Sequence, residues 1–466
     1  MSITEKLIST LISDTEILSV THEISGRIET SAGTLENLPP FCRVQLKMTP
    51  GSGSLIYTEV WLPDDWNGIF VGTGNGGIAG QVAYGWLVPF VQEGYAVANT
   101  DMGTSRGEKS GIGNPDVWKD FGWRATHLMT KAAKELVRVR YDRDPAYAYF
   151  VGSSTGGQQA MKEAQCFPED YDGILAAVPA NSRLNLHTFF LWNYVHLHTE
   201  DGTPMFSSEE ISTITDSAVA FYQARGDGMP GDRFVSLPLS DPEVISDFLQ
   251  QLRRDFPSFT EGQLSALAEI YQGPVDPATD KHIYCGLPIG SEDSHGGIWD
   301  CEQQVPPHFY PFLWTFGADV DPMKIDFDKD WRQLKETLSQ DLDADSVELE
   351  PFFSRGGKLI VYSGSSDPWV PFRSALEYCD KLYARFGSAE AVENHFRYYL
   401  LPGRDHGGSG KGYNFLCTKD LQPIFSVLRG WREDGILSED MYAVPVSPEK
   451  ITDKPETLRP VKSYKP

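Results

Sequence analysis

The chain has 466 residues, 40% of them hydrophobic and 12% aromatic, which is enough for one large domain core and an inserted or appended domain. Its formal net charge of −25 disfavours binding to nucleic acid or to an anionic membrane, because the field repels phosphates. No stretch approaches the ~20 apolar residues needed to span a bilayer, which disfavours a membrane protein.

The cysteines and the N-terminal sequence bear on the cellular compartment. Six scattered cysteines form no C-x-x-C pair, which disfavours a metal or redox site and favours free thiols, although Cys285 and Cys301 are close enough to pair in a secreted protein. The first ten residues lack the features of a signal peptide and are expected to form an amphipathic helix. We therefore expect a cytoplasmic location.

The first 180 residues alternate between strands and helices after a β-rich lead-in over residues 1–55. Apolar runs predict strands at 60–63, 68–72, 95–101, 149–153 and 171–179, and helical periodicity predicts helices at 82–93 and 119–140. His127 lies in the second helix, where a lone histidine is expected to be structural. The alternation predicts an α/β fold with a mostly parallel central sheet covered on both faces.

The loop Gly72–Gly77 follows one of these strands directly and is rich in glycine. Three interpretations are open from its spacing: a phosphate-binding loop, a flexible turn, or a loop that supplies a backbone N–H to an oxyanion hole. The phosphate-binding interpretation is weak, because no acidic residue follows a second strand at the expected place.

The segment Tyr149–Gly157 contains the pattern Gly152-x-Ser154-x-Gly156 and reads as a strand, a sharp turn and the start of a helix at about Gln158. This is the nucleophile-elbow pattern, in which a strained turn exposes the serine and small residues avoid collisions with neighbouring backbone. The N-terminus of the helix favours an anionic intermediate beside the serine. We therefore treat Ser154 as a candidate nucleophile.

The pattern changes over residues 181–354, where strands are scarce and helices, aromatic residues and proline-rich loops dominate. This predicts a large inserted lid domain, with aromatic side chains that are more often core than substrate cage. Within it, Asp227 and Asp232 are weak candidates for a cation loop. A solvated turn is favoured there, because calcium needs more oxygen ligands than two carboxylates supply.

Strands and helices alternate again from residue 355, with strands predicted at 357–364 and 396–401 and helices at 373–386 and 421–433. The tail from Pro445 is expected to form an extended strap. The predicted organisation is a core of 1–180 and 355–466, interrupted by the lid of 181–354.

Three residues, Ser154, Asp367 and His406, then follow the C-terminal ends of three separate predicted strands, which is where ligands bind in open α/β sheets. The order Ser, Asp, His is that of the α/β-hydrolases, in which the histidine takes the serine proton and the buried carboxylate orients the histidine. Asp405 is a rival carboxylate, but its adjacency to His406 disfavours it. With a serine nucleophile, the backbone N–H groups of Gly76 and Thr155 become the expected oxyanion donors.

The chain resembles the tannase and feruloyl esterase family over about residues 60–435. The matching segments are Asn75–Gly77, Gly94–Asp101, Gly152–Gly157, Phe167–Ile174, Gly356–Ile360 and Pro402–His406. The resemblance implies an α/β-hydrolase core with a large lid and cleavage of carboxylic esters, often with aromatic acyl groups.

Two departures from the family pattern matter. Family members usually carry cysteines, joined by a disulfide, at the positions of Ser153 and Gly407, and the joint absence of both fits a reducing compartment. In the family's calcium loop aspartates repeat at fixed spacing, whereas here Ala224 replaces one and the third is displaced to Asp232. We therefore expect no cofactor and no tight calcium site.

The favoured function is a serine ester hydrolase acting through an acyl-enzyme on a small aromatic or polyketide-like ester or lactone, with a role in secondary metabolism or aromatic catabolism. An alternative is a biosynthetic acyltransferase, or a lyase or cyclase that uses His406 as base without a covalent step. A non-catalytic binding protein is a third, disfavoured, interpretation. The sequence indicates neither the identity of the ester nor an oligomeric state.

Overall fold

The computed structural model describes residues 6–7, 9–10, 12–294, 298–299, 303, 305–408, 411–438, 440–445 and 458–466. The chain divides into two compact units. The first comprises Met1–Asn181, Phe312–Ala318 and Leu338–Ile360, and the second comprises Ser182–Pro311, Asp319–Thr337 and Val361–Pro466. The lid proposed from the sequence, 181–354, therefore contributes to both units, and its boundaries remain a prediction.

The first unit is built on a sheet whose central strands are buried along most of their length, whereas the edge strand β1 (Thr15–Glu23) is partly exposed. Its strands are β1 (Thr15–Glu23), β4 (Phe41–Met48), β5 (Ile56–Pro63), β6 (Ile69–Thr73), β7 (Ala96–Thr100), β8 (Tyr147–Ser153) and β9 (Gly173–Ala177), and a separate hairpin pairs β2 (Arg27–Thr30) with β3 (Gly33–Glu36). Every residue of β6, β7 and β9 is buried, as expected for strands covered on both faces.

The strand order in this unit is β1-β4-β5-β7-β6-β8-β9. The pairs from β1 to β7 are antiparallel, whereas β7, β6, β8 and β9 run parallel to one another. The predicted mostly parallel α/β sheet is therefore confirmed, with antiparallel strands added on one side by the N-terminal segment. The parallel strands matter for function, because their C-terminal ends lie at one edge of the sheet.

Helices α2 (Tyr84–Gln92), α4 (Ala125–Tyr141) and α5 (Thr155–Cys166) pack on these strands. The predicted helix at 119–140 starts later than expected, because a short α3 (Pro115–Lys119) and a π-helical turn, η2 (Asp120–Arg124), precede α4. In that turn the carboxylate of the buried Asp120 accepts a hydrogen bond from Arg124 Nε at 2.6 Å. The unit also contains α12 (Glu350–Ser354) and the 3-10 turn η1 (Glu108–Gly111).

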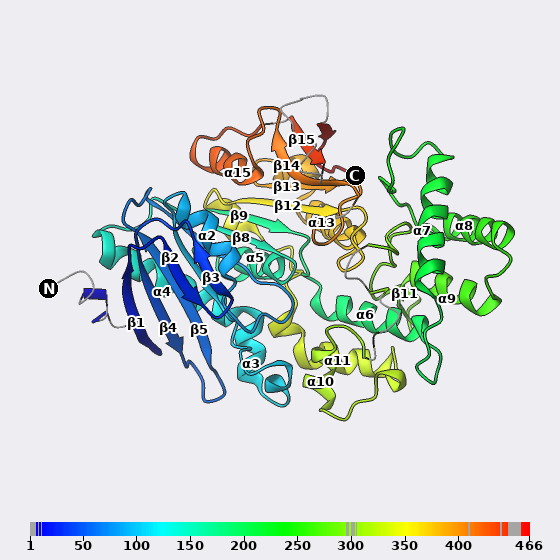
Figure 1. Cartoon of the computed structure of the whole chain (residues 1–466), viewed down its shortest axis with the longest axis horizontal. Coiled ribbons are helices and arrows are strands. Elements are labelled where there is room, and N and C mark those ends of the chain that lie inside the picture. The colour runs from blue at the N-terminus through cyan, green and yellow to red at the C-terminus, as the bar shows by residue number, and fades with distance from the viewer. Residues whose placement is uncertain are drawn as a thin grey trace. The chain divides into compact units, whose positions relative to one another are not determined.

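The second unit contains most of the lid segment and is rich in helices, as predicted. Its helices are α6 (Arg183–Leu197), α7 (Ser208–Gln223), α8 (Pro242–Asp255), α9 (Glu261–Gln272), α13 (Phe372–Phe386), α14 (Ala389–Val392) and α15 (Ile424–Glu433). Helix α8 packs against both α7 and α9, and all three are drawn in green in Figure 1. Capping boxes at Ser207 and Thr260 fix the starts of α7 and α9.

The strands of the second unit carry the loops that matter for chemistry. They are the neighbouring strands β12 (Lys358–Gly364) and β13 (Phe396–Leu401), the sheet of β14 (Tyr413–Thr418), β15 (Met441–Pro445) and β16 (Arg459–Val461), and the small pair β10 (Val275–Asp276) and β11 (Lys281–His282). Strand β12 begins three residues before the second unit does, and α10 (Tyr310–Phe316) and α11 (Lys329–Leu342) also include residues of both units. Part of the expected strap, residues 446–457, lies outside the described residues, but its end forms β16.

The described residues bear on two expectations, the absence of a membrane-spanning helix and the presence of free cysteines. None of their helices combines the length and apolar character needed to cross a membrane. Five of the six cysteines are described, and all five are free: Cys42, Cys166, Cys285, Cys379 and Cys417. The considered partner of Cys285, Cys301, lies outside the described residues.

Candidate active site

Ser154 stands between the end of β8 and the start of α5, in the first unit. Its backbone has φ 62° and ψ −115°, a strained conformation for a residue with a side chain. Three backbone hydrogen bonds hold it there: Ser154 N–H donates to Ala177 O at 3.0 Å, and Ser154 O accepts from Gln158 at 3.0 Å and from Ala180 at 3.1 Å. Helix α5 begins directly after the serine, three residues earlier than expected.

The glycines beside Ser154 are required by close backbone contacts. A Cβ on Gly152 would lie 2.2 Å from the carbonyl oxygen of Gly156, and a Cβ on Gly156 would lie 3.1 Å from the backbone nitrogen of Asn75. The first contact is impossible without a backbone shift, and the second is tight. The elbow predicted from the sequence therefore has the geometry that its pattern implies.

The glycine-rich loop after β6 is bound to the start of α5. Gly156 N–H donates to Asn75 O at 2.7 Å, and Thr155 Oγ1 donates to Gly77 O at 2.6 Å. Among the described residues, neither the backbone N–H of Gly76 nor that of Thr155 has a hydrogen-bond acceptor, and a Cβ on Gly76 would meet open space. Two donors without acceptors, next to a serine at a helix N-terminus, are the arrangement that binds an oxyanion.

The side chains of two asparagines, Asn75 in this loop and Asn99 in β7, hold the loop in place through hydrogen bonds to backbone carbonyls. Asn75 Nδ2 donates to Thr100 O at 2.8 Å, and Asn99 Nδ2 donates to Thr73 O at 2.9 Å. Asn75 N–H also donates to Gln159 Oε1 at 2.9 Å, which connects the loop to α5. Because Asn75 and Asn99 are almost fully buried, these bonds fix the backbone firmly.

Asp367 and His406 are brought together in the second unit, as the sequence order predicted. His406 Nδ1 donates to Asp367 Oδ2 at 2.8 Å. The other carboxylate oxygen, Oδ1, accepts the N–H groups of Trp369 and Val370, both at 2.9 Å, and the Asp367 side chain is completely buried. This bond selects the histidine tautomer whose Nε2 carries no proton and can accept one, and the side chain of His406 is 22% exposed.

The loops carrying these two residues are packed against each other. Ser366 N–H donates to Arg404 O at 3.1 Å, and Gly403 N–H donates to Ser365 Oγ at 2.7 Å. A Cβ on Gly364 would lie 2.1 Å from Arg404 O. The loop of Asp367 and the loop of His406 are therefore packed and hydrogen-bonded to each other within the second unit.

An aromatic cluster lies beside His406. The ring of Trp369 is 6.5 Å from that of His406, and His308 and Phe190 pack on Trp369 with centroid separations of 5.3 and 5.4 Å. Burial, with smaller contributions from the positive charges of Arg183 and His406, lowers the pKa of His308 to about 4. The cluster is therefore neutral at physiological pH and presents aromatic faces and an uncharged imidazole next to the catalytic candidate.

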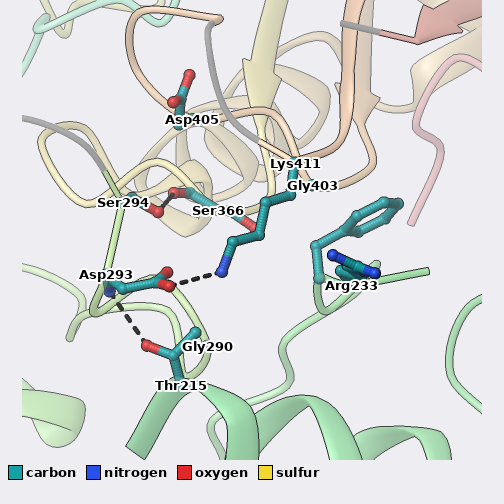
Figure 2. A pocket seen from close by; sticks show the side chains of 10 residues that line it. Thr215, Arg233, Gly290, Asp293, Ser294, Ser366, Gly403, Asp405 and Lys411 are labelled. Atoms are coloured by element: carbon teal, nitrogen blue, oxygen red, sulfur yellow. Dashed lines mark hydrogen bonds and ion pairs between the residues drawn. The ribbon is translucent and has the colours of Figure 1, made fainter. Parts of the chain in front are cut away.

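A pocket of about 330 Å³ borders the same pair of loops (Figure 2). Its lining includes Ser366 and Asp405, the residues just before Asp367 and His406. In Figure 2 the ammonium group of Lys411 points toward Asp293, and the two form an ion pair at 2.6 Å. The pocket is large enough for a small polar group and combines charges of both signs.

The two weak calcium candidates are already engaged with other partners. Asp227 accepts the backbone N–H groups of Ser236 and Leu237 at 2.7 and 3.0 Å. Asp232 Oδ2 accepts the N–H of Met229 at 2.8 Å and pairs with Arg459 at 3.0 Å. Neither carboxylate is among the described side chains that have a buried oxygen without a hydrogen-bond partner. The expectation that this loop holds no calcium stays a prediction.

One cluster of functional groups was not predicted. His127, expected to be merely structural, donates from Nδ1 to Asp170 Oδ2 at 2.6 Å, and Glu163 on α5 completes a group whose potential ligand atoms lie within 4.8 Å of one another. Burial, together with the negative charge of Asp170, raises the pKa of Glu163 well above its usual value. The sequence feature that could have indicated this cluster is the short distance between Glu163, near the end of α5, and Asp170, in the segment Phe167–Ile174 that follows the helix.

The comparisons with known proteins extend along nearly the whole chain. The family model described as "Tannase and feruloyl esterase" matches residues 42–304 and 310–464. An esterase of Xanthomonas campestris pv. campestris is 30% identical, covering 98% of this chain and 87% of the relative, and feruloyl esterase B of Aspergillus niger is 26% identical, covering 86% and 78%.

Solved structures agree on the fold. The crystal structure of feruloyl esterase B from Aspergillus oryzae has a TM-score of 0.83 at 21% identity, covering 99% of this chain and 96% of that one. Tannin acyl hydrolase from Aspergillus niger has a TM-score of 0.77 at 18% identity, covering 99% and 91%. These likenesses confirm the α/β-hydrolase fold. The chain therefore belongs to the tannase and feruloyl esterase family and is a carboxylic ester hydrolase.

Proposed function

We propose that this enzyme cleaves esters through an acyl-enzyme formed on Ser154, with His406 as general base and acid and Asp367 as the group that orients it. The observation that carries the proposal is the strained Ser154 at the N-terminus of α5, beside two backbone N–H groups that have no acceptor in the part of the chain that the structure describes. The chain order Ser, Asp, His and the bond between His406 and Asp367 support it further. Ser154 belongs to the first unit and the other two residues to the second, so the joint action of all three is part of the proposal.

The first half-reaction follows from these roles. The Ser154 hydroxyl attacks the ester carbonyl while His406 Nε2 takes its proton, and the negative charge that develops on the carbonyl oxygen is held by the N–H groups of Gly76 and Thr155. The C–O bond to the alcohol then breaks, and His406 returns the proton to the leaving alkoxide. Asp367 stabilises the imidazolium throughout without becoming protonated.

The second half-reaction regenerates the enzyme. Water attacks the acyl-serine, with His406 accepting a proton from the water, and collapse of the intermediate releases the acid and restores the Ser154 hydroxyl. The net change is an ester and water converted to an acid and an alcohol. No cofactor or metal enters these steps.

We further propose a small aromatic or polyketide-like ester or lactone as substrate, used in secondary metabolism or aromatic catabolism. The neutral aromatic surface of Trp369, His308 and Phe190 beside His406 supports an aromatic group. The names of the relatives, which include feruloyl esterases and a tannin acyl hydrolase, point the same way. A cytoplasmic location belongs to the same proposal, since non-cysteine residues stand at Ser153 and Gly407 and the five described cysteines are free.

Labelling with a fluorophosphonate probe, read by intact mass, tests the chemistry. The wild type is expected to gain one adduct on Ser154, and Ser154→Ala is expected to gain none and to lose turnover of a 4-nitrophenyl ester. Full turnover by Ser154→Ala would refute the acyl-enzyme and favour a reaction in which His406 acts as base without a covalent step. Transfer of the acyl group to an added alcohol in preference to water would instead identify an acyltransferase.

A further inference from the structure

The loop from Asp227 to Leu237 in the second unit is a tight turn held by two carboxylates. It contains two glycines with positive φ, Gly228 and Gly231, and the carboxylate of Asp227 closes it by accepting the N–H groups of Ser236 and Leu237. Asp232 binds the N–H of Met229 across the turn. Such a turn concentrates negative charge, which must be compensated when it is partly buried.

The compensating charge comes from Arg459, in β16 near the end of the chain. Its Nη1 pairs with Asp232 Oδ2 at 3.0 Å, and its Nη2 donates to Ser236 Oγ at 3.1 Å. The guanidinium also lies over the ring of Tyr413, 5.5 Å from the centroid. The side chains of Arg459 and Asp232 are only 15% and 12% exposed, so this pair is screened much less by solvent than a surface pair.

The same loop contacts both elements that carry Asp367 and His406. The carbonyl oxygen of Val235 accepts a hydrogen bond from Ser365 Oγ at 2.9 Å, two residues before Asp367. Phe234 packs on Gly403, three residues before His406, so closely that a Cβ there would lie 2.3 Å from the ring. Displacement of the loop would therefore move both catalytic loops together.

We propose that the guanidinium of Arg459 acts as a built-in cation that replaces calcium in this loop, and that through the loop it positions Asp367 and His406. The first part, that Arg459 supplies the positive charge of the loop, is supported by the contacts described above. The second part, that Arg459 positions Asp367 and His406, rests on the proposed function. A fixed guanidinium suits this task, because its planar fork satisfies a carboxylate and a hydroxyl at once and stays charged at every physiological pH. Arg459 is a positioning residue, since it acts through Phe234 and Val235.

The principal variant is Arg459→Met, which keeps the length of the side chain and removes its charge. We expect a fall in Tm of about 4 °C or more, because Asp232 is left unpaired in a poorly solvated site. We expect kcat on a 4-nitrophenyl ester to fall about tenfold with little change in KM, because the ester still binds while the catalytic loops are displaced. A low, non-denaturing concentration of guanidinium chloride should restore part of the lost kcat, whereas the same concentration of sodium chloride should not.

Two further variants sharpen the experiment. Arg254→Met makes the same chemical change at an exposed pair with Asp255 in the same unit, and it should leave Tm and kcat unchanged. Arg459→Lys keeps the charge but cannot satisfy Asp232 and Ser236 together, so its Tm should lie between those of wild type and Arg459→Met. If Arg459→Met does not fold, the lysine variant carries the test.

Calcium ions provide the opposing test on the wild-type enzyme. We expect that added Ca²⁺ does not raise Tm and that EDTA does not lower it. A rise in Tm with Ca²⁺ that Asp232→Asn abolishes would overturn the proposal, as would an Arg459→Met enzyme with the Tm of the wild type. An Arg459→Met enzyme with lowered Tm but unchanged kcat would overturn only the claim that Arg459 positions Asp367 and His406. Failure of the proposed function is recognised separately, by a wild-type enzyme that the fluorophosphonate does not label at Ser154.

Discussion

Replacing Asp367 by asparagine tests how the carboxylate acts on His406. In the wild type Oδ1 is held by the N–H groups of Trp369 and Val370, and Oδ2 accepts from His406 Nδ1. Asparagine keeps the first two bonds only if its amide oxygen takes the place of Oδ1. Its NH₂ group then faces Nδ1 and can only donate, which forces the histidine into the tautomer with the proton on Nε2. That nitrogen can no longer accept the proton of Ser154.

The size of the effect follows from the geometry. A carboxylate and an imidazolium whose charges lie about 4 Å apart attract each other by about 4 kcal/mol at the effective dielectric constant of such sites, and this attraction is lost in the transition state. That loss alone lowers kcat about a thousandfold, and the unfavourable tautomer brings the expected fall to about 10³–10⁴. The free energy of unfolding should drop by only about 1 kcal/mol, since most hydrogen bonds of the side chain remain.

The assay is steady-state hydrolysis of a 4-nitrophenyl ester, with Tm measured on the same samples. Asp405→Asn is the matched control, because Asp405 is also buried and lies beside His406 in sequence, and it should retain most of the wild-type kcat. An Asp367→Asn enzyme with more than about a tenth of the wild-type kcat would refute the reasoning. A fall in Asp405→Asn as deep as that in Asp367→Asn would show that the carboxylate was assigned wrongly.

Two other variants probe the surroundings of Ser154. Gly74→Ala would place a Cβ 2.4 Å from the Cα of Gly156, so we expect the glycine-rich loop after β6 to move, with a loss of about 1–3 kcal/mol in the free energy of unfolding and a lower kcat. Denaturant titration and steady-state kinetics measure the two effects, and wild-type values for both would contradict the packing argument. Because burial raises the folded-state pKa of Glu163 well above its unfolded value near 4.5, the stability this group contributes is complete below that value and is lost as pH rises toward the folded pKa. Glu163→Gln cannot lose a proton, so its stability relative to wild type should increase as pH rises above about 5, by at most about 1.4 kcal/mol per pH unit. Parallel pH profiles of the two proteins in urea titrations would contradict the assignment.

Much of the fold was predictable because it depends on local patterns. Continuous apolar runs identified the buried strands β6, β7, β8 and β9, and the glycine spacing identified the elbow at Ser154. The bond between Asp367 and His406 was also anticipated, since both residues follow strands and the C-terminal ends of parallel strands lie at one edge of a sheet. The start of α5 was placed three residues too late, because the helix begins immediately after the strained serine.

The interactions between distant side chains were not predictable in the same way. The pairs Arg459–Asp232 and His127–Asp170 join residues 227 and 43 positions apart, and nothing in a single sequence indicates which of 40 lysines and arginines or 10 histidines faces a given carboxylate. The π-helical turn before α4 was also missed, because it depends on the burial of Asp120 beside Arg124.

The sequence by itself therefore determined the α/β-hydrolase class, the nucleophile elbow and the identity of the acid and histidine candidates, because strand periodicity, glycine spacing and residue order are written locally in the chain. Only the tertiary structure decided that the backbone N–H groups of Gly76 and Thr155 have no acceptor among the described residues, and that Asp232 is bound by Arg459. The reason is physical: a hydrogen bond or ion pair depends on positions within a few tenths of an ångström, and those positions are set by packing between segments far apart in the sequence.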